Sequence, residues 1–227
     1  MAIREQTSPN HNARPAGQAV DMLLLHYTGM ASAAAALARL RDPAAQVSAH
    51  YLIDEDGAVT RLVPEERRAW HAGVACWAGE SDVNGRSIGI ELVNPGHEFG
   101  YRDFPEAQMA ALIDLAREIV ARHAIPAARV LGHSDVAPLR KRDPGERFDW
   151  ARLAAAGIGL WPAFIGPAGD ATRLEADLAR FGYGFLADDP QAVIAAFQRH
   201  YRPWSVTGLA DAESAARLAA LLDPPHG

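Results

Sequence analysis

Hydrophobic and polar residues follow one another along the first two thirds of the chain in patterns typical of alternating strands and helices. Apolar runs at residues 22–27 and 87–93 predict two buried strands. Other patterns predict a helix at 32–41, a β-hairpin at 48–63, a long helix opening at Pro105, and a short strand at 129–131. Strands that alternate with helices predict a sheet covered by helices, an α/β arrangement.

The pattern changes after residues 161–162. Residues 166–170 have the Gly- and Pro-rich composition of a linker, and three short helices are expected beyond it. The first is predicted to start at Thr172, with Glu175 completing a capping box, the second at 189–190, and the third to span about 211–222. We therefore expect two domains, 1–165 and a small three-helix domain at 170–227. The alternative is a helical cap packed on the first domain.

Composition narrows the class of protein. The chain has 227 residues, 49% of them hydrophobic, and a formal net charge of -6 without a large basic tract, which argues against nucleic acid as a partner. Its apolar runs are too short for a membrane span, and residues 1–17 lack the apolar core of a secretory signal. We expect a cytoplasmic protein. A periplasmic or outer-membrane location would follow if a signal had been removed.

The single cysteine, Cys76, excludes an intramolecular disulfide. A lone cysteine is more often a small buried hydrophobic residue than a nucleophile. A cysteine peptidase built on Cys76 and a histidine has no motif to support it.

Two histidines and one aspartate occupy positions that suit a metal. His26 closes one apolar strand, His133 follows another, and Asp143 lies in a turn ten residues later. Taken alone, each histidine is more often a satisfied core residue. Together, two imidazoles and a carboxylate could form an open zinc site, because catalytic zinc keeps three protein ligands and leaves one position for water. Five further histidines are expected on the surface: His11, His97, His123, His200 and His226.

Glu91 interrupts the apolar strand at 87–93. Strand alternation places it on the face opposite Ile88, Ile90 and Leu92, either exposed to solvent or facing a cleft as a general base. Lys141, two residues before Asp143, is either part of a solvated basic cluster or a stabiliser of an oxyanion.

Six short motifs occur in a fixed order: LLHYTG at 24–29, SAHYLI at 48–53, AWHAG at 69–73, SIGIELVN at 87–94, GHSDVAP at 132–138 and KRDPG at 141–145. The set resembles the N-acetylmuramoyl-L-alanine amidases, in particular the AmpD/AmiD family, whose fold is like that of the peptidoglycan recognition proteins. Six ordered motifs are far more specific than any one of them. Residues 172–222 resemble a three-helix peptidoglycan-binding domain.

The resemblance implies a mixed β-sheet flanked by helices, classed as α/β or, in some schemes, α+β. It implies zinc on His26, His133 and Asp143, with Glu91 as general base and Lys141 as oxyanion stabiliser. It further implies four substrate-binding residues, His50, Trp70, His71 and Asn94. The expected reaction is hydrolysis of the amide bond between N-acetylmuramic acid and L-alanine in peptidoglycan or (anhydro)muropeptides. The alternative is a non-catalytic peptidoglycan-binding protein on the same fold, which would be expected to lack at least one ligand.

Overall fold

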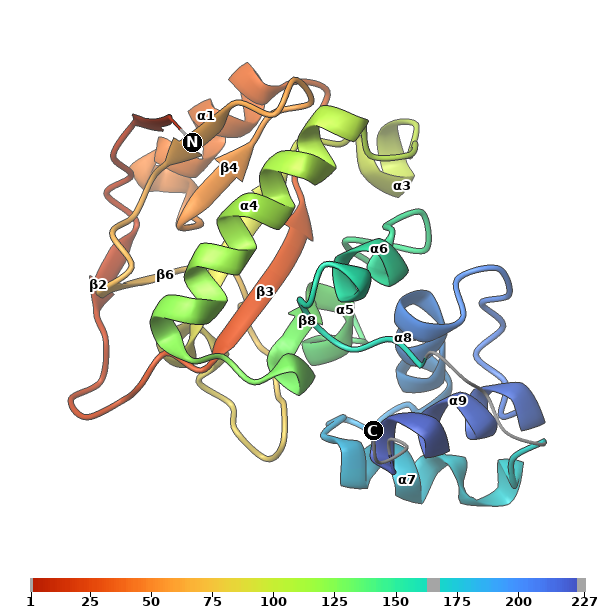
Figure 1. Ribbon diagram of the computed structural model, residues 1–227. Coiled ribbons are helices and arrows are strands. Elements are labelled where there is room, and N and C mark those ends of the chain that lie inside the picture. The colour runs from red at the N-terminus through yellow and green to blue at the C-terminus, as the bar shows by residue number, and fades with distance from the viewer. Residues whose placement is uncertain (1, 163–167, 224–227) are drawn as a thin grey trace.

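The computed structural model describes residues 2–162 and 168–223, and its centre is a six-stranded mixed sheet (Figure 1). The strands follow the order β1-β5-β4-β7-β3-β8, and only β4 and β5 pair antiparallel. Their bounds are β1 Ile3–Glu5, β3 Met22–Tyr27, β4 Tyr51–Ile53, β5 Val59–Arg61, β7 Ser87–Leu92 and β8 Val130–Gly132. A separate antiparallel pair joins β2 (His11–Ala13) to β6 (Arg67–Ala69).

One face of the sheet is covered by the long helix α4 (Glu106–His123), which crosses in front of β3 in Figure 1. Its apolar stripe packs against the alternate residues of β3 and β7 that point to this side, including Leu23, Leu25, Ile88, Ile90 and Leu92. The buried Gln108 amide donates to the carbonyls of Ile53 and Val93, both at 3.0 Å. This packing leaves the opposite face of the sheet for polar side chains from the same strands.

The opposite face carries shorter elements. Helix α1 (Ala33–Arg41), whose first turn is capped by the Ser32 hydroxyl, packs on β4 through Ala36 and Leu40. Helix α5 (His133–Val136) begins directly where β8 ends. The other short helices of residues 2–162 are η1 (Pro43–Ala45), α2 (Val83–Arg86), α3 (Gly96–Phe99), η2 (Ala127–Arg129) and α6 (Trp150–Ala155).

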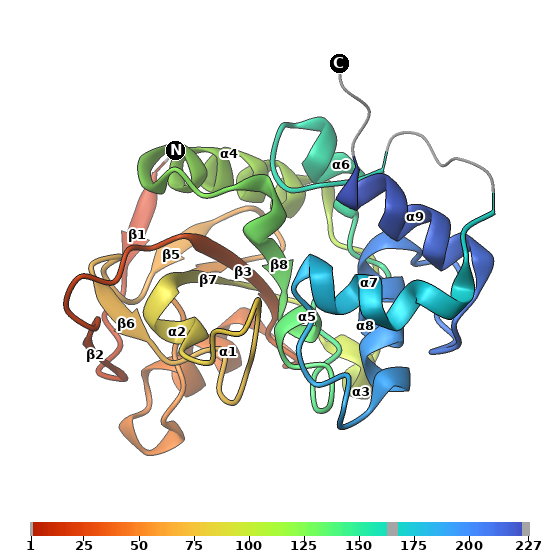
Figure 2. The same cartoon turned by 90° about the horizontal axis from the view of Figure 1, so that it is seen from below.

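The C-terminal helices lie beside β8 and α5 in both views (Figures 1 and 2). They are η3 (Ala171–Arg173), α7 (Leu174–Phe181), α8 (Pro190–Tyr201) and α9 (Ala212–Leu222). Their apolar residues join one hydrophobic cluster with Leu24 of β3, Leu131 of β8 and Trp77. The sheet and these helices therefore share a core.

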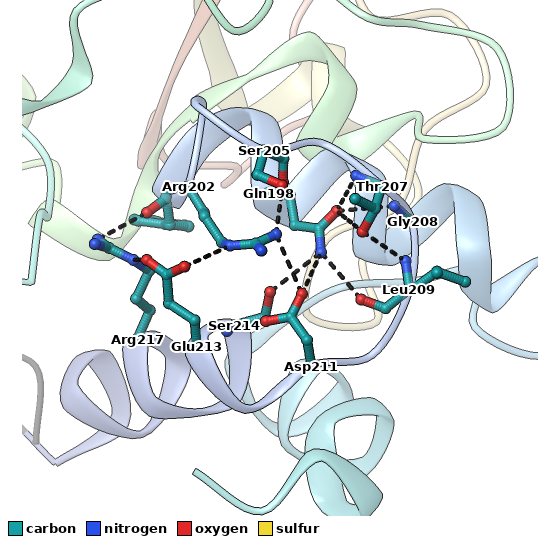
Figure 3. A network of polar contacts seen from close by, with 11 residues as sticks. Gln198, Arg202, Ser205, Thr207, Gly208, Leu209, Asp211, Glu213, Ser214 and Arg217 are labelled. Atoms are coloured by element: carbon teal, nitrogen blue, oxygen red, sulfur yellow. Dashed lines mark hydrogen bonds and ion pairs between the residues drawn. The ribbon is translucent and has the colours of Figure 1, made fainter. Parts of the chain in front are cut away.

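A polar network fixes the loop between α8 and α9 (Figure 3). The buried Gln198 carboxamide accepts from the amides of Thr207 and Gly208, both at 2.8 Å, and donates to the Leu209 carbonyl at 3.1 Å. Arg202 pairs with Glu213 of α9 at 2.9 Å. These contacts hold α9 against α8 and give the helical layer a defined shape.

The structure confirms the fold class and the order of strands and helices. The predicted capping box at Thr172 is wrong. The Asp170 carboxylate caps the short helix η3 by accepting from the Thr172 amide at 3.0 Å, and α7 starts only at Leu174. Part of the predicted linker, 166–167, lies outside the described residues. The division into domains at 165 and 170 stays a prediction, and the shared core favours the alternative of a helical cap.

In the described part of the chain, no helix combines the length and hydrophobicity that crossing a bilayer requires. The expected cytoplasmic location stays a prediction.

Candidate active site

Three side chains converge where β3 and β8 end. His26 comes from the end of β3, His133 opens α5 directly after β8, and Asp143 lies in the turn that follows. His26 Nδ1 lies 2.9 Å from His133 Nδ1 and 3.1 Å from Asp143 Oδ2, and His133 Nδ1 lies 3.0 Å from the same oxygen. Ligands about 2.0–2.1 Å from a tetrahedral zinc stand about 3.3 Å apart, so this triangle has the right size and donor set for such a metal.

The hydrogen bonds behind the triad leave both Nδ1 atoms free to bind. His133 Nε2 lies 3.0 Å from the Ala72 carbonyl, which only accepts, so this nitrogen carries the hydrogen. His26 Nε2 lies 3.0 Å from His71 Nδ1, while His71 Nε2 faces the Ser87 hydroxyl at 3.3 Å. That hydroxyl donates to the Val83 carbonyl at 2.7 Å. Its oxygen therefore accepts from His71, and His71 Nδ1 accepts from His26, an arrangement typical of partners that orient metal-binding imidazoles.

Burial and the contacts within the triad together set the pKa values of His26 and Asp143. Burial lowers the pKa of His26 to about 4; the neighbouring His133 lowers this pKa further, and Asp143 opposes both effects. Burial alone would raise the pKa of Asp143, but His133 and His26 more than offset it, so this pKa lies well below its usual range. Neutral imidazole and ionised carboxylate are the forms that bind a metal.

Glu91 lies beside the triad because β3 and β7 pair in parallel with His26 opposite Glu91. Its Oε2 atom is inaccessible to solvent and has no hydrogen-bond partner among the described residues. Burial raises the pKa of Glu91 well above its usual value, Asp143 adds to this, and Lys141 opposes it. A carboxylate oxygen buried without a partner is costly, so its presence here points to a chemical role.

Gly89, two residues before Glu91, makes room for the site. A Cβ atom at this position would lie 2.6 Å from the His71 ring, so only glycine lets this imidazole rest on the strand. The glycine in the motif at 87–94 therefore sets the position of the ring behind His26.

A pocket of about 340 Å³ opens over the triad. Its walls include Glu91, Lys141, His71, Tyr27 and His97. The structure thus places the predicted general base and the predicted oxyanion stabiliser on one cavity with His133 and Asp143.

The other predicted substrate-binding residues do not line this pocket. His50 is buried, with its Nδ1 accepting from the Gly89 amide at 2.9 Å. Trp70 donates from its indole to Asn12 at 2.8 Å, and the Asn94 carboxamide bonds backbone groups of the neighbouring loop. Their roles in binding stay predictions.

Of the five histidines expected on the surface, His11 and His123 are partly exposed and contact Arg67 and Glu65, and His226 lies outside the described residues. The other two, His200 and His97, have structural roles. His200 is only 2% exposed and donates from Nδ1 to Asp135 at 2.7 Å, so the surface prediction for it is wrong. His97 lines the pocket and joins the Tyr27 hydroxyl at 2.8 Å to Glu146 at 3.1 Å. Helical spacing from Val193 and Phe197 would have placed residue 200 on the buried face of α8.

Comparison with known proteins agrees with this geometry. The sequence model of the Amidase_2 family, described as N-acetylmuramoyl-L-alanine amidase, matches residues 16–146. The chain is 39% identical to N-acetylmuramoyl-L-alanine amidase AmiD of Escherichia coli over 96% of this chain and 88% of AmiD. It is 34% identical to 1,6-anhydro-N-acetylmuramyl-L-alanine amidase AmpD of Enterobacter cloacae over 67% of this chain and 88% of AmpD.

A solved structure of Escherichia coli AmiD, in complex with the substrate anhydro-N-acetylmuramic acid-L-Ala-D-γ-Glu-L-Lys, superposes with a TM-score of 0.81 at 38% identity. It covers 92% of this chain and 91% of the AmiD chain. The likeness to AmiD therefore extends over the C-terminal helices, whereas the likeness to AmpD spans about two thirds of the chain.

Proposed function

This chain belongs to the N-acetylmuramoyl-L-alanine amidase family, and from that membership we propose how its own residues carry out the reaction. It is an N-acetylmuramoyl-L-alanine amidase, an enzyme that hydrolyses the amide bond between N-acetylmuramic acid and L-alanine. The proposed substrates are muropeptides of the class bound to Escherichia coli AmiD, in which L-alanine is followed by a γ-linked glutamate.

The proposed cofactor is zinc, held by His26, His133 and Asp143. The observation that carries this proposal is the triangle of 2.9–3.1 Å between their ligand atoms, with both Nδ1 lone pairs left free by hydrogen bonds behind the rings. Zinc at such a site polarises an amide carbonyl and lowers the pKa of a water. All three ligand positions are present, which counts against the alternative of a non-catalytic binding protein.

Glu91 is the proposed general base. Its carboxylate faces the triad from the neighbouring strand and has no other partner among the described residues, so it is free to take a proton from the attacking water. Burial raises the pKa of Glu91, which makes its carboxylate a stronger proton acceptor, and Glu91 then passes the proton to the departing alanine amine. Lys141, on the same pocket, supplies a positive charge for the oxyanion of the tetrahedral intermediate.

Metal analysis and product analysis together test the proposal. We expect about one zinc per chain by elemental analysis, the stoichiometry of a three-ligand catalytic site. The variant His133→Ala is expected to lose zinc and turnover. The control His11→Ala, which removes a histidine of β2 outside the triad, is expected to keep both. Mass spectrometry of the products should show the free L-alanine amine. Full activity after exhaustive chelation, with no metal detected, would refute the zinc mechanism.

A further inference from the structure

A second hollow, of about 300 Å³, lies beside the active-site pocket. One wall is the loop 138–142, and the other is formed by Ala192, Ala195 and Arg199 of helix α8. The two cavities share the side chains of residues 140–142, so the hollow continues the active-site pocket toward the C-terminal helices.

The hollow is strongly positive although the chain carries a net charge of -6. Its lining includes Arg140, Lys141, Arg142 and Arg199 and no acidic residue. The Arg140 guanidinium is engaged by the Val74 carbonyl at 2.8 Å. The other three cations have no ion-pair partner within 4.0 Å among residues 2–162 and 168–223. Positive charge is thus concentrated here, and none of these three cations forms a direct ion pair among residues 2–162 and 168–223.

Helix α8 holds Arg199 in place over open space. The residues on either side of it, Gln198 and His200, are buried and hydrogen-bonded, which fixes this turn of the helix. Ala195 and Ala192 precede Arg199 by about one and two turns on the same face, and their short side chains leave room in front of the guanidinium. The side chain therefore projects into the hollow from a rigid support.

The guanidinium groups of Arg142 and Arg199 repel each other electrostatically. Partial burial lowers the pKa of Arg199, Glu146 opposes this, and Arg142 adds to it. Glu146 already accepts from His97 at 3.1 Å. Arginine stays cationic at neutral pH, so an anion placed between Arg142 and Arg199 would relieve their repulsion.

We infer that this hollow is a subsite for a carboxylate of the peptide part of the substrate, bound by Arg142 and Arg199. The inference rests on the proposed substrate class. A glutamate linked through its γ-carbon keeps a free α-carboxylate, which lies a short distance beyond the bond that is cut. Guanidinium groups bind carboxylates through paired hydrogen bonds, and their planar fork loses less conformational freedom for each hydrogen bond formed than a lysine does. The subsite would make the enzyme selective for stem peptides with a free carboxylate.

The test uses four anhydromuropeptides ending L-Ala-D-γ-Glu-L-Lys: the parent, the α-carboxamide at glutamate, the C-terminal amide, and the diamide. The full-length zinc enzyme is compared with Arg142→Gln and Arg199→Gln. Arg180→Gln, on the exposed side of α7, is a control with the same change of charge. Binding of the released tripeptide and its amides is measured by calorimetry, which is independent of turnover.

With the unsubstituted enzyme, we expect that converting one of the two substrate carboxylates to an amide lowers kcat/KM about tenfold to a hundredfold, mainly by raising KM. This is the range for losing a hydrogen bond to a charged group. Loss at the glutamate amide assigns the α-carboxylate, and loss at the C-terminal amide assigns the terminal one. In both arginine variants the discrimination should disappear, whereas Arg180→Gln should keep it.

Two outcomes overturn the inference. In one, the enzyme without substitutions cleaves all four substrates equally. In the other, the arginine variants keep the discrimination or lose activity on every substrate alike. If the enzyme without substitutions cleaves none of the four substrates, the proposed substrate class is refuted instead.

Discussion

Replacing His200 with alanine tests whether the C-terminal helices support the metal site. The Asp135 carboxylate is fully buried in α5, two residues after His133, and accepts from three donors at 2.7 Å: the Gly132 amide, the Tyr183 hydroxyl and His200 Nδ1. Two of these donors come from the C-terminal layer. The helix that begins with His133 is therefore fixed from both sides.

The structure gives the size of the expected effect. His200 is stacked between Trp150 and Tyr201, with ring centroids 3.6 and 3.8 Å away, so the variant loses a hydrogen bond to a buried carboxylate and leaves a cavity. The two losses together should destabilise the fold by about 3–5 kcal/mol. For a chain of this length that corresponds to a fall in Tm of about 6–20 °C.

Thermal unfolding and metal titration of the folded protein measure the two consequences. We expect zinc affinity to fall about tenfold, as when groups that orient metal ligands are lost. The control His123→Ala removes a partly exposed histidine that pairs with Glu65 on the opposite side of the sheet, and should cost about 1 kcal/mol or less. A Tm within about 2 °C of this control, with unchanged zinc affinity, would show that the C-terminal layer does not hold the site.

Three further predictions concern Glu91, His50 and the C-terminal helices. Glu91→Gln should keep zinc and lose about a hundredfold in kcat, since it removes the proton acceptor alone; near-normal turnover would contradict this. Burial, then Arg14, lowers the pKa of His50 to about 3, so the unfolded chain binds this proton first and stability falls as pH drops from 6.5 toward 3. In urea unfolding of the metal-free protein, His50→Gln should reduce that slope by up to about 1.4 kcal/mol per pH unit, whereas an equal slope would refute it. A chain ending after Trp161 should lose activity on soluble muropeptides and on sacculi together, with a lower Tm; retention of the soluble activity alone would instead support an independent binding domain.

Local signals in the sequence predict β3, β4, β5, β7 and β8 and the side of β7 that Glu91 faces, but they do not predict β1, β2 or β6. The apolar run at 22–27 and the alternation around Glu91 predict β3, β7 and the orientation of this carboxylate correctly, because they depend on neighbours two residues away. The register that sets Glu91 beside His26 is a long-range property, and no local pattern contains it. The predicted helix start at Thr172 is wrong for a related reason: Asp170 and Thr172 are both good capping residues, and only the packed structure selects Asp170, as the cap of η3.

The predicted site residues divide in the same way. His133 and Asp143 lie in one connected segment, so their proximity was foreseeable, whereas the hydrogen bond from His26 to His71 depends on tertiary packing over Gly89. The surface prediction for His200 rests on its position at the end of a helix. Its helical phase with Phe197 was the better guide, since one turn separates two residues that both face the core.

The segment 132–143 links these observations. It supplies His133 and Asp143 to the metal triad, Lys141 to the pocket, and Asp135 to the C-terminal helices. A loop that carries so many polar groups has little apolar surface of its own, so its shape must come from contacts with neighbouring elements. Sheet strand β8 fixes one end of it, and the buried bonds to Asp135 fix its first turn. The helical layer therefore does more than extend the chain: it completes the support of a loop that the sheet alone holds from one side.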